Sequence, residues 1–233
     1  MTITEQKEFE EILRLLEPFT RVFIVGCGEC ATLCQTGGEY EVEEMKKKLA
    51  EAGKHVTGSA IPDAVCEILD TKRVLRQARD AVAEAEALLV LCCGAGVQAV
   101  VEAAGEGKHV IPGCNTLFLG DTYRKGQHYE WCSMCTECVL GEYGGICPIT
   151  RCPKGQTNGP CGGTDKGKCE VDPEQDCVWT LIFERAKALG VWTAIADRKR
   201  LKDPKDYSRL RKPRKRIYEP RRAGLRASTH SGE

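Results

Sequence analysis

The sequence predicts an α/β fold, in which a small parallel sheet of three to four strands with flanking helices precedes a cysteine-rich, loop-dominated domain and a basic extended tail. Apolar runs alternate with helical patterns between residues 20 and 119, which is typical of parallel strands joined by right-handed crossovers. Eight of the 15 cysteines follow between residues 131 and 177, among glycines and prolines. We therefore expect domains at residues 1–125 and 126–195 and a tail at 196–233.

The elements of the first domain follow from apolar spacing and turn residues. Residues 5–16 repeat apolar positions at helical spacing, and Pro18 closes that run. The run RVFIVG predicts a buried strand that enters a glycine turn, and ALLVLCCGAG repeats the pattern. Further strands are expected at residues 55–59 and 109–113, and further helices at 39–52, at 62–85 with a break near Asp70, and at 97–104.

Composition favours metal ligation over disulfides. The chain opens with an acidic amphipathic pattern rather than a signal peptide, and no apolar stretch reaches the roughly 20 residues that span a bilayer. We therefore expect a cytoplasmic protein whose thiols stay reduced. The odd count of 15 cysteines also fits a disulfide framework poorly.

Charge is segregated along the chain. Residues 197–233 carry fourteen Lys and Arg against five Asp and Glu, so the formal net charge of zero averages a tail of +9 and a body of −9. Prolines and few large aliphatic side chains predict that the tail is extended or disordered. It is either a solvated tail or an arm that wraps an acidic partner subunit. Nucleic acid is not an expected partner, because the body lacks a nucleic-acid-binding module.

Loops at the carboxyl ends of the expected strands carry cysteine. Cys27, Cys30 and Cys34 follow the first strand, Cys93 follows the third and Cys114 the last. Such loops meet at the switch point of a parallel sheet, where ligands bind. We expect the CxxCxxxC run and Cys93, with Cys114 in reserve, to supply four thiolates to a [4Fe-4S] cluster, although zinc accepts the same ligands.

The remaining cysteines of this half have a simpler interpretation. Burial as a small apolar side chain accounts for Cys66, Cys92 and Cys114 without a ligand role, and we expect it for Cys66, which stands inside a helical pattern. A competing motif is VGCGECA at residues 25–31, which matches the dinucleotide fingerprint GxGxxA after a strand. A Rossmann site also needs an acidic residue at the end of the second strand, and none occurs there before Asp63. Nucleotide binding therefore ranks last.

The central segment carries a more specific metal signal. CSMCTEC has the CxxCxxC spacing of bacterial-type ferredoxins, and a proline follows both Cys147 and Cys152. Eight thiols suffice for two further four-cysteine sites, and the sequence does not pair them: Cys132, Cys135, Cys138, Cys147, Cys152, Cys161, Cys169 and Cys177. Two to three [4Fe-4S] clusters are thus expected in the chain, with zinc as the alternative at part of the central sites.

A helix is expected at residues 176–189, where apolar positions recur at helical spacing and Gly190 ends the pattern. Trp179 and Phe183 stand one helical step apart on it. We expect this helix to pack on the α/β domain. The alternative is that its aromatic side chains face a partner subunit.

The stretch TNGPCGGTDKGKCEVDPEQDCVWTLIFERAKALG, residues 157–190, resembles the cysteine-rich module of anaerobic methylenetetrahydrofolate reductases. Together with CGECATLCQTGGE and CCGAGVQAV, it makes residues 20–195 similar to the small iron–sulfur subunit of the heteromeric form of that enzyme. The resemblance implies a role in the one-carbon metabolism of acetogens and related anaerobes. It also implies a partner barrel subunit that carries FMN or FAD and the folate and reduces methylenetetrahydrofolate to methyltetrahydrofolate.

The residues fit a chain that conducts electrons. The sequence offers no convincing acid/base pair or activated nucleophile, so we expect no catalytic residue and a lone chain that is inactive. We expect it to relay electrons from an upstream donor, ferredoxin or another redox subunit, to the flavin of the reductase. A zinc-binding scaffold or assembly subunit of the same complex is the alternative, since a domain of this family has also been described as zinc-binding.

Overall fold

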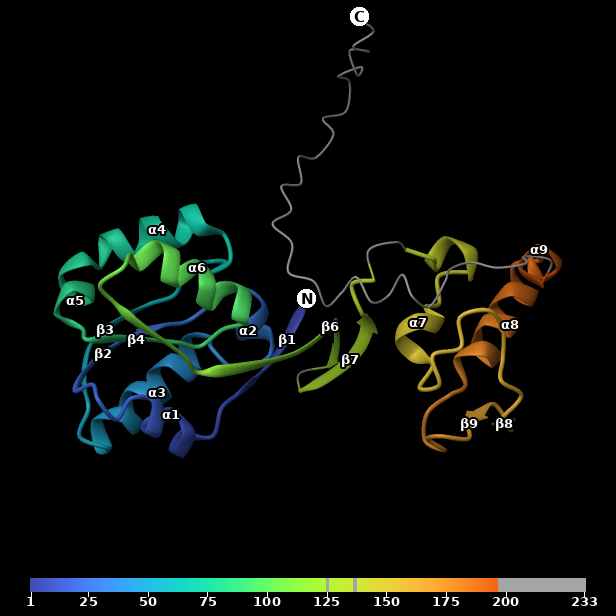
Figure 1. Ribbon diagram of the computed structural model, residues 1–233, viewed down its shortest axis with the longest axis horizontal. Coiled ribbons are helices and arrows are strands. Elements are labelled where there is room, and N and C mark those ends of the chain that lie inside the picture. The colour runs from blue at the N-terminus through green and yellow to red at the C-terminus, as the bar shows by residue number, and fades with distance from the viewer. Residues whose placement is uncertain (125, 136–137, 197–233) are drawn as a thin grey trace, which may run out of the picture.

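The computed structural model describes residues 1–124, 126–135 and 138–196. Its main sheet has four parallel strands in the order β3-β2-β4-β5, which confirms the expected α/β class. The α/β part, a β-hairpin and the cysteine-rich part follow one another across Figure 1. The elements of the α/β part are β1 (Thr2–Gln6), α1 (Phe9–Leu15), β2 (Arg21–Val25), α2 (Cys30–Leu33), α3 (Glu39–Glu51), β3 (His55–Ala60), α4 (Ile68–Gln77), α5 (Arg79–Glu84), β4 (Ala87–Val90), α6 (Gly94–Ala104) and β5 (His109–Pro112).

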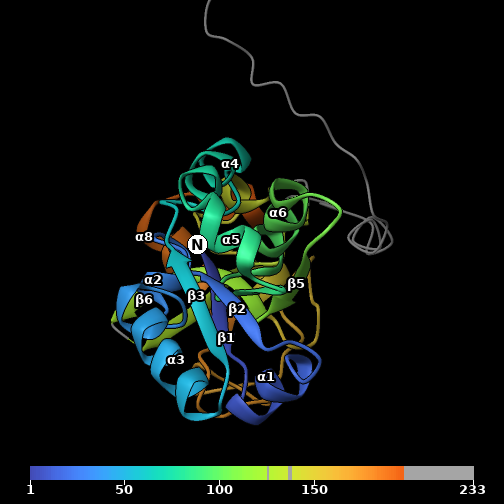
Figure 2. The ribbon, with the colours of Figure 1, turned by 90° about the vertical axis from the view of Figure 1, so that its left-hand side faces the viewer.

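Helices cover both faces of the parallel sheet. Figure 2 shows α1 and α3 on one side of it and α4, α5 and α6 on the other. Strands β2 and β4 occupy the middle, and their alternate side chains feed two separate apolar clusters. Ile24 and Leu89 belong to the cluster under α1 and α3, whereas Phe23 and Leu88 belong to the cluster under the other helices. Burial on both faces explains why these strands read as continuous apolar runs.

A second sheet, which the sequence did not lead us to expect, joins the chain start to the middle. It is antiparallel, with the order β1-β6-β7, where β6 is Cys114–Arg124 and β7 is Gln127–Cys132. The expected helix at residues 5–16 is therefore wrong in its first turn, because Glu5 and Gln6 pair with β6 as a strand and α1 begins at Phe9. Ile3 and Thr4 of β1 are buried in this sheet. Strand pairing therefore outweighs the helical pattern at Glu5 and Gln6.

Two helix boundaries in the α/β part also differ from the sequence-based expectation. The pattern at residues 62–85 forms α4 and α5, and the break falls at Ala78 rather than Asp70. Glu67 is the N-cap of α4, since its carboxylate accepts the N–H groups of Leu69 and Asp70. Residues before Glu67 are thereby left in a loop. Helix α6 begins at Gly94, three residues before the expected start.

The cysteine-rich part has little regular structure and a small core of its own. Its elements are a 3-10 turn η1 (Leu140–Glu142), α7 (Pro148–Arg151), the two-residue strands β8 (Thr164–Asp165) and β9 (Lys168–Cys169), α8 (Val178–Ala188) and α9 (Trp192–Ala196). Val139, Tyr143, Val178, Trp179 and Ile182 form its buried apolar cluster. The expectation that the last long helix packs on the α/β domain is wrong, because α8 contributes to this local core.

The division of the chain near residue 125 remains a proposal. Strand β7 continues the antiparallel sheet as far as Cys132. None of the helices formed by the described residues is long and apolar enough to cross a membrane. The basic tail beyond Ala196 lies outside the described residues, so the expectation of an extended arm is not addressed by the structure.

Candidate metal centres

Twelve cysteines fall into three groups, which differ in the elements that hold them. Cys66 is among them although it was not expected to bind metal, and Cys34, which was expected to do so, is described separately below. The sheet-edge group follows the parallel strands and consists of Cys27, Cys30, Cys66 and Cys93. The hairpin group lies between β7 and α7 and consists of Cys132, Cys135, Cys138 and Cys147. The loop group lies between α7 and α8 and consists of Cys152, Cys161, Cys169 and Cys177.

Cys27, Cys30 and Cys93 lie in the loops where they were expected, at the carboxyl ends of adjacent strands. Cys27 follows β2, Cys30 opens the short α2, and Cys93 is the N-cap residue of α6 after β4. The N–H of Cys27 donates to the carbonyl of Gly37 at 2.8 Å. This hydrogen bond fixes the loop after β2 to the turn after α2. Cys27 is buried, while Cys30 and Cys93 are half-buried, so the group opens at the surface.

Cys66 joins this group, contrary to the expectation of a buried residue inside a helix. It is exposed and lies in the loop between β3 and α4. The pKa of its thiol is raised, first by partial burial and then by the nearby thiols of Cys93, Cys27 and Cys30. These neighbours belong to the loops after β4 and β2, the strands that follow β3 in the sheet order.

Cys34, by contrast, contacts the antiparallel sheet. It is buried, and its Sγ lies 3.8 Å from the carbonyl oxygen of Thr2 in β1. Cys114 lies on the same side, where its thiol donates to the carbonyl of Thr36 at 3.5 Å. Burial raises the pKa of Cys114 to about 12, and the thiols of Cys34 and Cys93 contribute to the shift in the same direction. Cys114 is part of the buried cluster under α1 and α3, and its role as a reserve ligand stays a prediction.

Cys92 is a second core thiol. Its exposed fraction is 1 %, and burial strongly raises its pKa. Gly96 of α6 packs directly on its sulfur, since a Cβ at that position would lie 2.5 Å from Cys92 Sγ. Packing as a small apolar side chain accounts for this residue.

In the hairpin group, Thr150 links the CxxCxxC run to Cys147. The N–H of Ser133 donates to Thr150 Oγ1 at 3.0 Å, and the thiol of Cys147 lies 3.6 Å from the same oxygen. Cys132 Sγ accepts the N–H of Met134 at 3.4 Å, where Met134 adopts a left-handed backbone with φ of 51°. The run that leaves β7 and the residue that precedes α7 therefore lie side by side.

The four cysteines of the loop group line one small cavity of roughly 20 Å³. Backbone N–H groups point at two of these sulfurs: Gln156 donates to Cys152 and Gly163 donates to Cys161, each at 3.4 Å. Cys177 is the N-cap residue of α8. Burial acts to raise its pKa, but the hydrogen bonds from Thr180, Trp179 and Thr164 outweigh burial and lower it. These hydrogen bonds favour the thiolate of Cys177, which is the form that binds metal.

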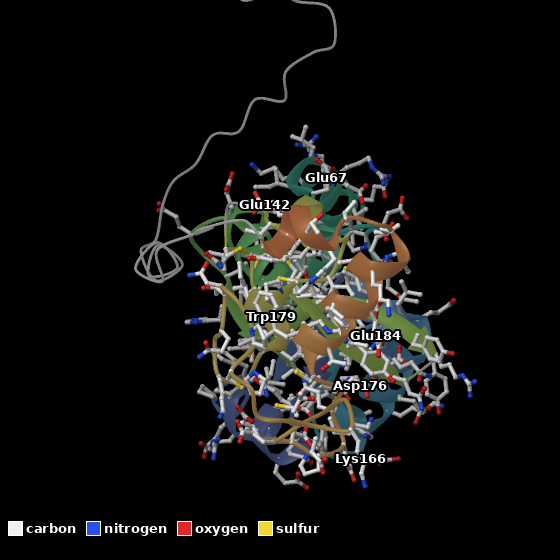
Figure 3. The ribbon with its side chains drawn as sticks, turned by 90° about the vertical axis from the view of Figure 1, so that its right-hand side faces the viewer. Glu67, Glu142, Lys166, Asp176, Trp179 and Glu184 are labelled. Atoms are coloured by element: carbon white, nitrogen blue, oxygen red, sulfur yellow. The ribbon has the colours of Figure 1, made fainter. Side chains whose placement is uncertain are left out.

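Two aromatic side chains hold the loop that carries Cys152 and Cys161, and sequence patterning missed this role. Trp179 is buried and donates its indole N–H to the carbonyl of Gln156 at 3.1 Å. Tyr143 donates its hydroxyl to the carbonyl of Thr157 at 2.9 Å, and the two rings meet edge to face at 5.3 Å. In Figure 3, Trp179 lies on the loop side of α8 and Glu184 on the other side. The burial of Trp179 disfavours the alternative that it faces a partner, whereas Phe183 is exposed.

Several charged side chains lie close to the sulfurs. Lys154 pairs with Glu170, and Glu170 also accepts from the thiol of Cys161 at 3.7 Å. Lys168 pairs with Asp176 at 2.6 Å beside Cys177. Arg151 stacks on the ring of Trp131 at 4.4 Å, and burial is the main cause that lowers its pKa. The two lysines are paired with carboxylates, so these ion pairs add little net charge beside the thiols.

Within the described ranges, no three His, Cys, Asp or Glu side chains lie as one group that could hold a metal ion. The fit of these sites to a bound group therefore rests on the chemistry of the donors: sets of four cysteines and backbone N–H donors aimed at sulfur. A four-thiolate set fits both a [4Fe-4S] cluster and zinc.

The GxGxxA motif does not form a dinucleotide site of the usual kind. Helix α2, which follows it, has only four residues, so the aligned N–H groups that bind pyrophosphate in a Rossmann unit are lacking there. The glycines serve close backbone packing instead. A Cβ on Gly26 would lie 2.6 Å from the carbonyl oxygen of Gly37, and one on Gly28 would lie 3.1 Å from that of Asp63.

Comparison with known proteins links the second half of the chain to one family. Residues 111–208 match the family model described as methylene-tetrahydrofolate reductase C terminal. This span contains the hairpin and loop groups completely and ends before the last residues of the basic tail. No curated protein and no solved structure matched the chain.

Proposed function

We propose that this chain is the electron-transfer subunit of a cytoplasmic methylenetetrahydrofolate reductase complex. In this role it passes electrons through two to three [4Fe-4S] clusters to the flavin of a catalytic subunit, which reduces 5,10-methylenetetrahydrofolate to 5-methyltetrahydrofolate. The upstream donor is ferredoxin or another redox subunit. The catalytic chemistry belongs to the partner, and the chain contributes metal-binding cysteines only.

The observation that carries the proposal is the loop group, whose four cysteines surround a single cavity and two of whose sulfurs accept backbone N–H groups. A bound [4Fe-4S] cluster takes up and releases one electron, and hydrogen bonds to its sulfurs and its solvent exposure tune the potential. Gln156, Gly163 and the N-terminus of α8 are the parts of this chain placed to make such bonds. Trp179 and Tyr143 keep the loop in position for them.

The link to the reductase rests on the family match over residues 111–208 and on the resemblance of the motifs within it. The described histidines give no support to a catalytic role. His55 lies beside Glu84 on the surface, His109 stacks on Phe19 and His128 contacts the hydroxyl of Thr122. Each of these contacts is structural or solvent-facing, so the chain is best suited to conduct electrons for a partner.

A zinc-held scaffold is the second candidate, because tetrahedral zinc accepts the same four thiolates as a cluster. The narrow cavity of roughly 20 Å³ between the loop cysteines is the specific observation that favours it at that site. In this alternative the chain stabilises or assembles the reductase, and electrons reach the flavin by another route.

The two candidates differ in how the flavin is reduced. The complex of this chain with its flavin subunit is prepared without oxygen, and flavin reduction by reduced ferredoxin is followed by absorbance. We expect Cys169→Ala to slow this reduction at least tenfold and to remove one low-temperature EPR signal of the reduced protein. Cys92→Ala is the control, since this core thiol binds no metal in our account.

Size-exclusion chromatography of each variant establishes whether the complex is intact. Flavin reduction at the unchanged rate in an intact Cys169→Ala complex, with no EPR signal in either protein, would contradict the relay and support the scaffold.

A further inference from the structure

We infer that Cys66, rather than Cys34, completes the metal-binding site at the sheet edge, so that Cys27, Cys30, Cys66 and Cys93 are its four ligands. This inference rests on the proposed function, since it concerns the ligands of a cluster that the relay requires. It also changes the expected ligand set, in which Cys34 completed the CxxCxxxC run.

The strand order places the four cysteines in three neighbouring loops. Strands β3, β2 and β4 are consecutive in the sheet, and all three run parallel. Their carboxyl ends therefore lie at one edge, from which the chain continues to Cys66, to Cys27 and Cys30, and to Cys93 respectively. Cys66 and Cys93 thus flank the loop of Cys27 from its two sides.

The loop of Cys66 is fixed against the loop of Cys27 by backbone contacts. The N–H of Gly26 donates to the carbonyl of Ala60, and that of Gly28 donates to the carbonyl of Pro62, both at 2.9 Å. Gly28 packs tightly on the second loop, since a Cβ there would lie 3.1 Å from the carbonyl oxygen of Asp63. The two loops are therefore in direct contact on either side of Cys27.

The same loop is fixed on its other side to the helix that begins after Cys93. Val65 is fully buried, and its carbonyl accepts the hydroxyl of Thr71 at 2.8 Å. Gly96, in the first turn of α6, packs on Val65, because a Cβ there would lie 3.1 Å from Val65 Cγ1. With Val65 held inside, the neighbouring Cys66 is left exposed at the surface where Cys93 and Cys30 also open.

The environment of Cys34 differs on each of these points. Its sulfur lies 3.8 Å from the carbonyl of Thr2, a residue of the antiparallel sheet. The following turn is fixed there as well, by a 2.6 Å contact between the hydroxyls of Thr36 and Thr4, both buried. Cys34 therefore lies under β1 beside Cys114.

The chemical class that such a site takes is an iron–sulfur cluster, because four thiolates that converge from short loops are the usual ligands of a [4Fe-4S] unit. Two of the four cysteines are half-buried and Cys66 is exposed. A cluster held there lies at the surface, where a redox partner can approach it.

Two matched variants of the full chain, Cys66→Ala and Cys34→Ala, test the inference after purification without oxygen. We expect Cys66→Ala to lose about four iron atoms and four acid-labile sulfides, one cluster's worth, and Cys34→Ala to keep them. Loss of iron in Cys34→Ala with full iron in Cys66→Ala would overturn the inference.

A second readout uses the unmodified chain and does not depend on how a variant folds. The native, oxygen-free protein is treated with iodoacetamide, and alkylated cysteines are identified by mass spectrometry. We expect Cys66, despite its exposure, to be protected until the metal is removed by a chelator and then to react readily. Rapid alkylation of Cys66 in the metal-loaded protein would contradict ligation.

The same experiment separates this inference from the proposed function. If the preparation contains zinc and no sulfide, the relay fails. Protection of Cys66 in that zinc-loaded protein would still support it as a ligand, and rapid alkylation there would overturn the inference.

Discussion

The two halves of the molecule are held together in different ways. In the α/β half, β2 and β4 are buried on both faces, and two apolar clusters fill the space between sheet and helices. In the cysteine-rich half, five residues form the buried core and two strands have only two residues each. Eight cysteines accompany that small core. The comparison indicates that apolar burial shapes the first half, and we propose that thiolate–metal bonds shape the second.

Removal of metal should have the largest effect. It should unfold the cysteine-rich half and leave the α/β half folded. A chelator under anaerobic conditions should expose the backbone amides of residues 139–189 to hydrogen exchange, while those of residues 87–112 stay protected. The reason is that the second region loses its cross-links and the first keeps its apolar core. Hydrogen exchange of both regions is measured by mass spectrometry in one sample, so that residues 87–112 serve as the internal control. Equal protection of the two regions after metal removal would contradict the comparison.

The next largest effect should come from a cavity created in the apolar core of the α/β half. It should lower the stability of that half. Leu88 is fully buried in the cluster under α4 to α6. Leu88→Ala should lower the free energy of unfolding of this half by about 2–5 kcal/mol, as measured by urea unfolding. Leu117→Ala, at an exposed position of β6, is the matched control and should have little effect. The metal content of the hairpin and loop groups should not change in either variant.

A substitution at Gly37 should lower the stability less than Leu88→Ala does, but it should also disturb the sheet-edge site. A Cβ at this position would collide with the backbone carbonyl of Leu91, and the carbonyl of Gly37 accepts the N–H of Cys27 at 2.8 Å. Gly37→Ala should therefore cost about 1–3 kcal/mol and displace Cys27, with loss of iron from that site only. Gly107→Ala, where a Cβ meets nothing within 4 Å, is the control. Unchanged iron in Gly37→Ala would mean that this loop does not position the ligand.

The smallest effect should come from the contact between β1 and the turn after α2. Thr4 and Thr36 share a buried hydrogen bond of 2.6 Å, and the hydroxyl of Thr36 also donates to the carbonyl of Ala31 at 3.3 Å. Thr4→Val keeps the shape of the side chain and leaves Thr36 one partner, so we expect a loss of about 0.5–1.5 kcal/mol in thermal or urea unfolding. A loss as large as that of Leu88→Ala would indicate that β1 is a major support of the α/β half.

Much of the α/β half could be predicted from sequence, because its strands are buried on both faces. RVFIVG and ALLVL are continuous apolar runs that end in glycine turns, and both proved to be central parallel strands. Strands β6 and β7 were missed because most of their side chains are exposed or half-buried and alternate weakly, and β1 was missed because a helical pattern overlaps its last two residues. The hairpin residues are mostly polar or turn-forming, as in a linker. They are seen to be strands only because β6 pairs with β1 at the start of the chain and with β7.

The sequence identified most of the candidate cysteines, but it did not show which of them lie together. The CxxCxxC run and the cysteines after β2 and β4 were found from spacing alone. Cys66 was missed because a helical pattern seemed to continue through it, and the Glu67 cap that starts α4 after it was not recognised. The roles of Trp179 and Tyr143 depend on carbonyl groups far along the chain, which periodicity does not reveal.

The central claim is that inorganic clusters shape and serve the cysteine-rich half, and its most direct test is chemical analysis of oxygen-free protein. Iron, acid-labile sulfide and zinc are measured per chain. We predict iron and sulfide in equal amounts, about eight to twelve of each for two to three clusters. Stoichiometric zinc without labile sulfide would contradict the claim.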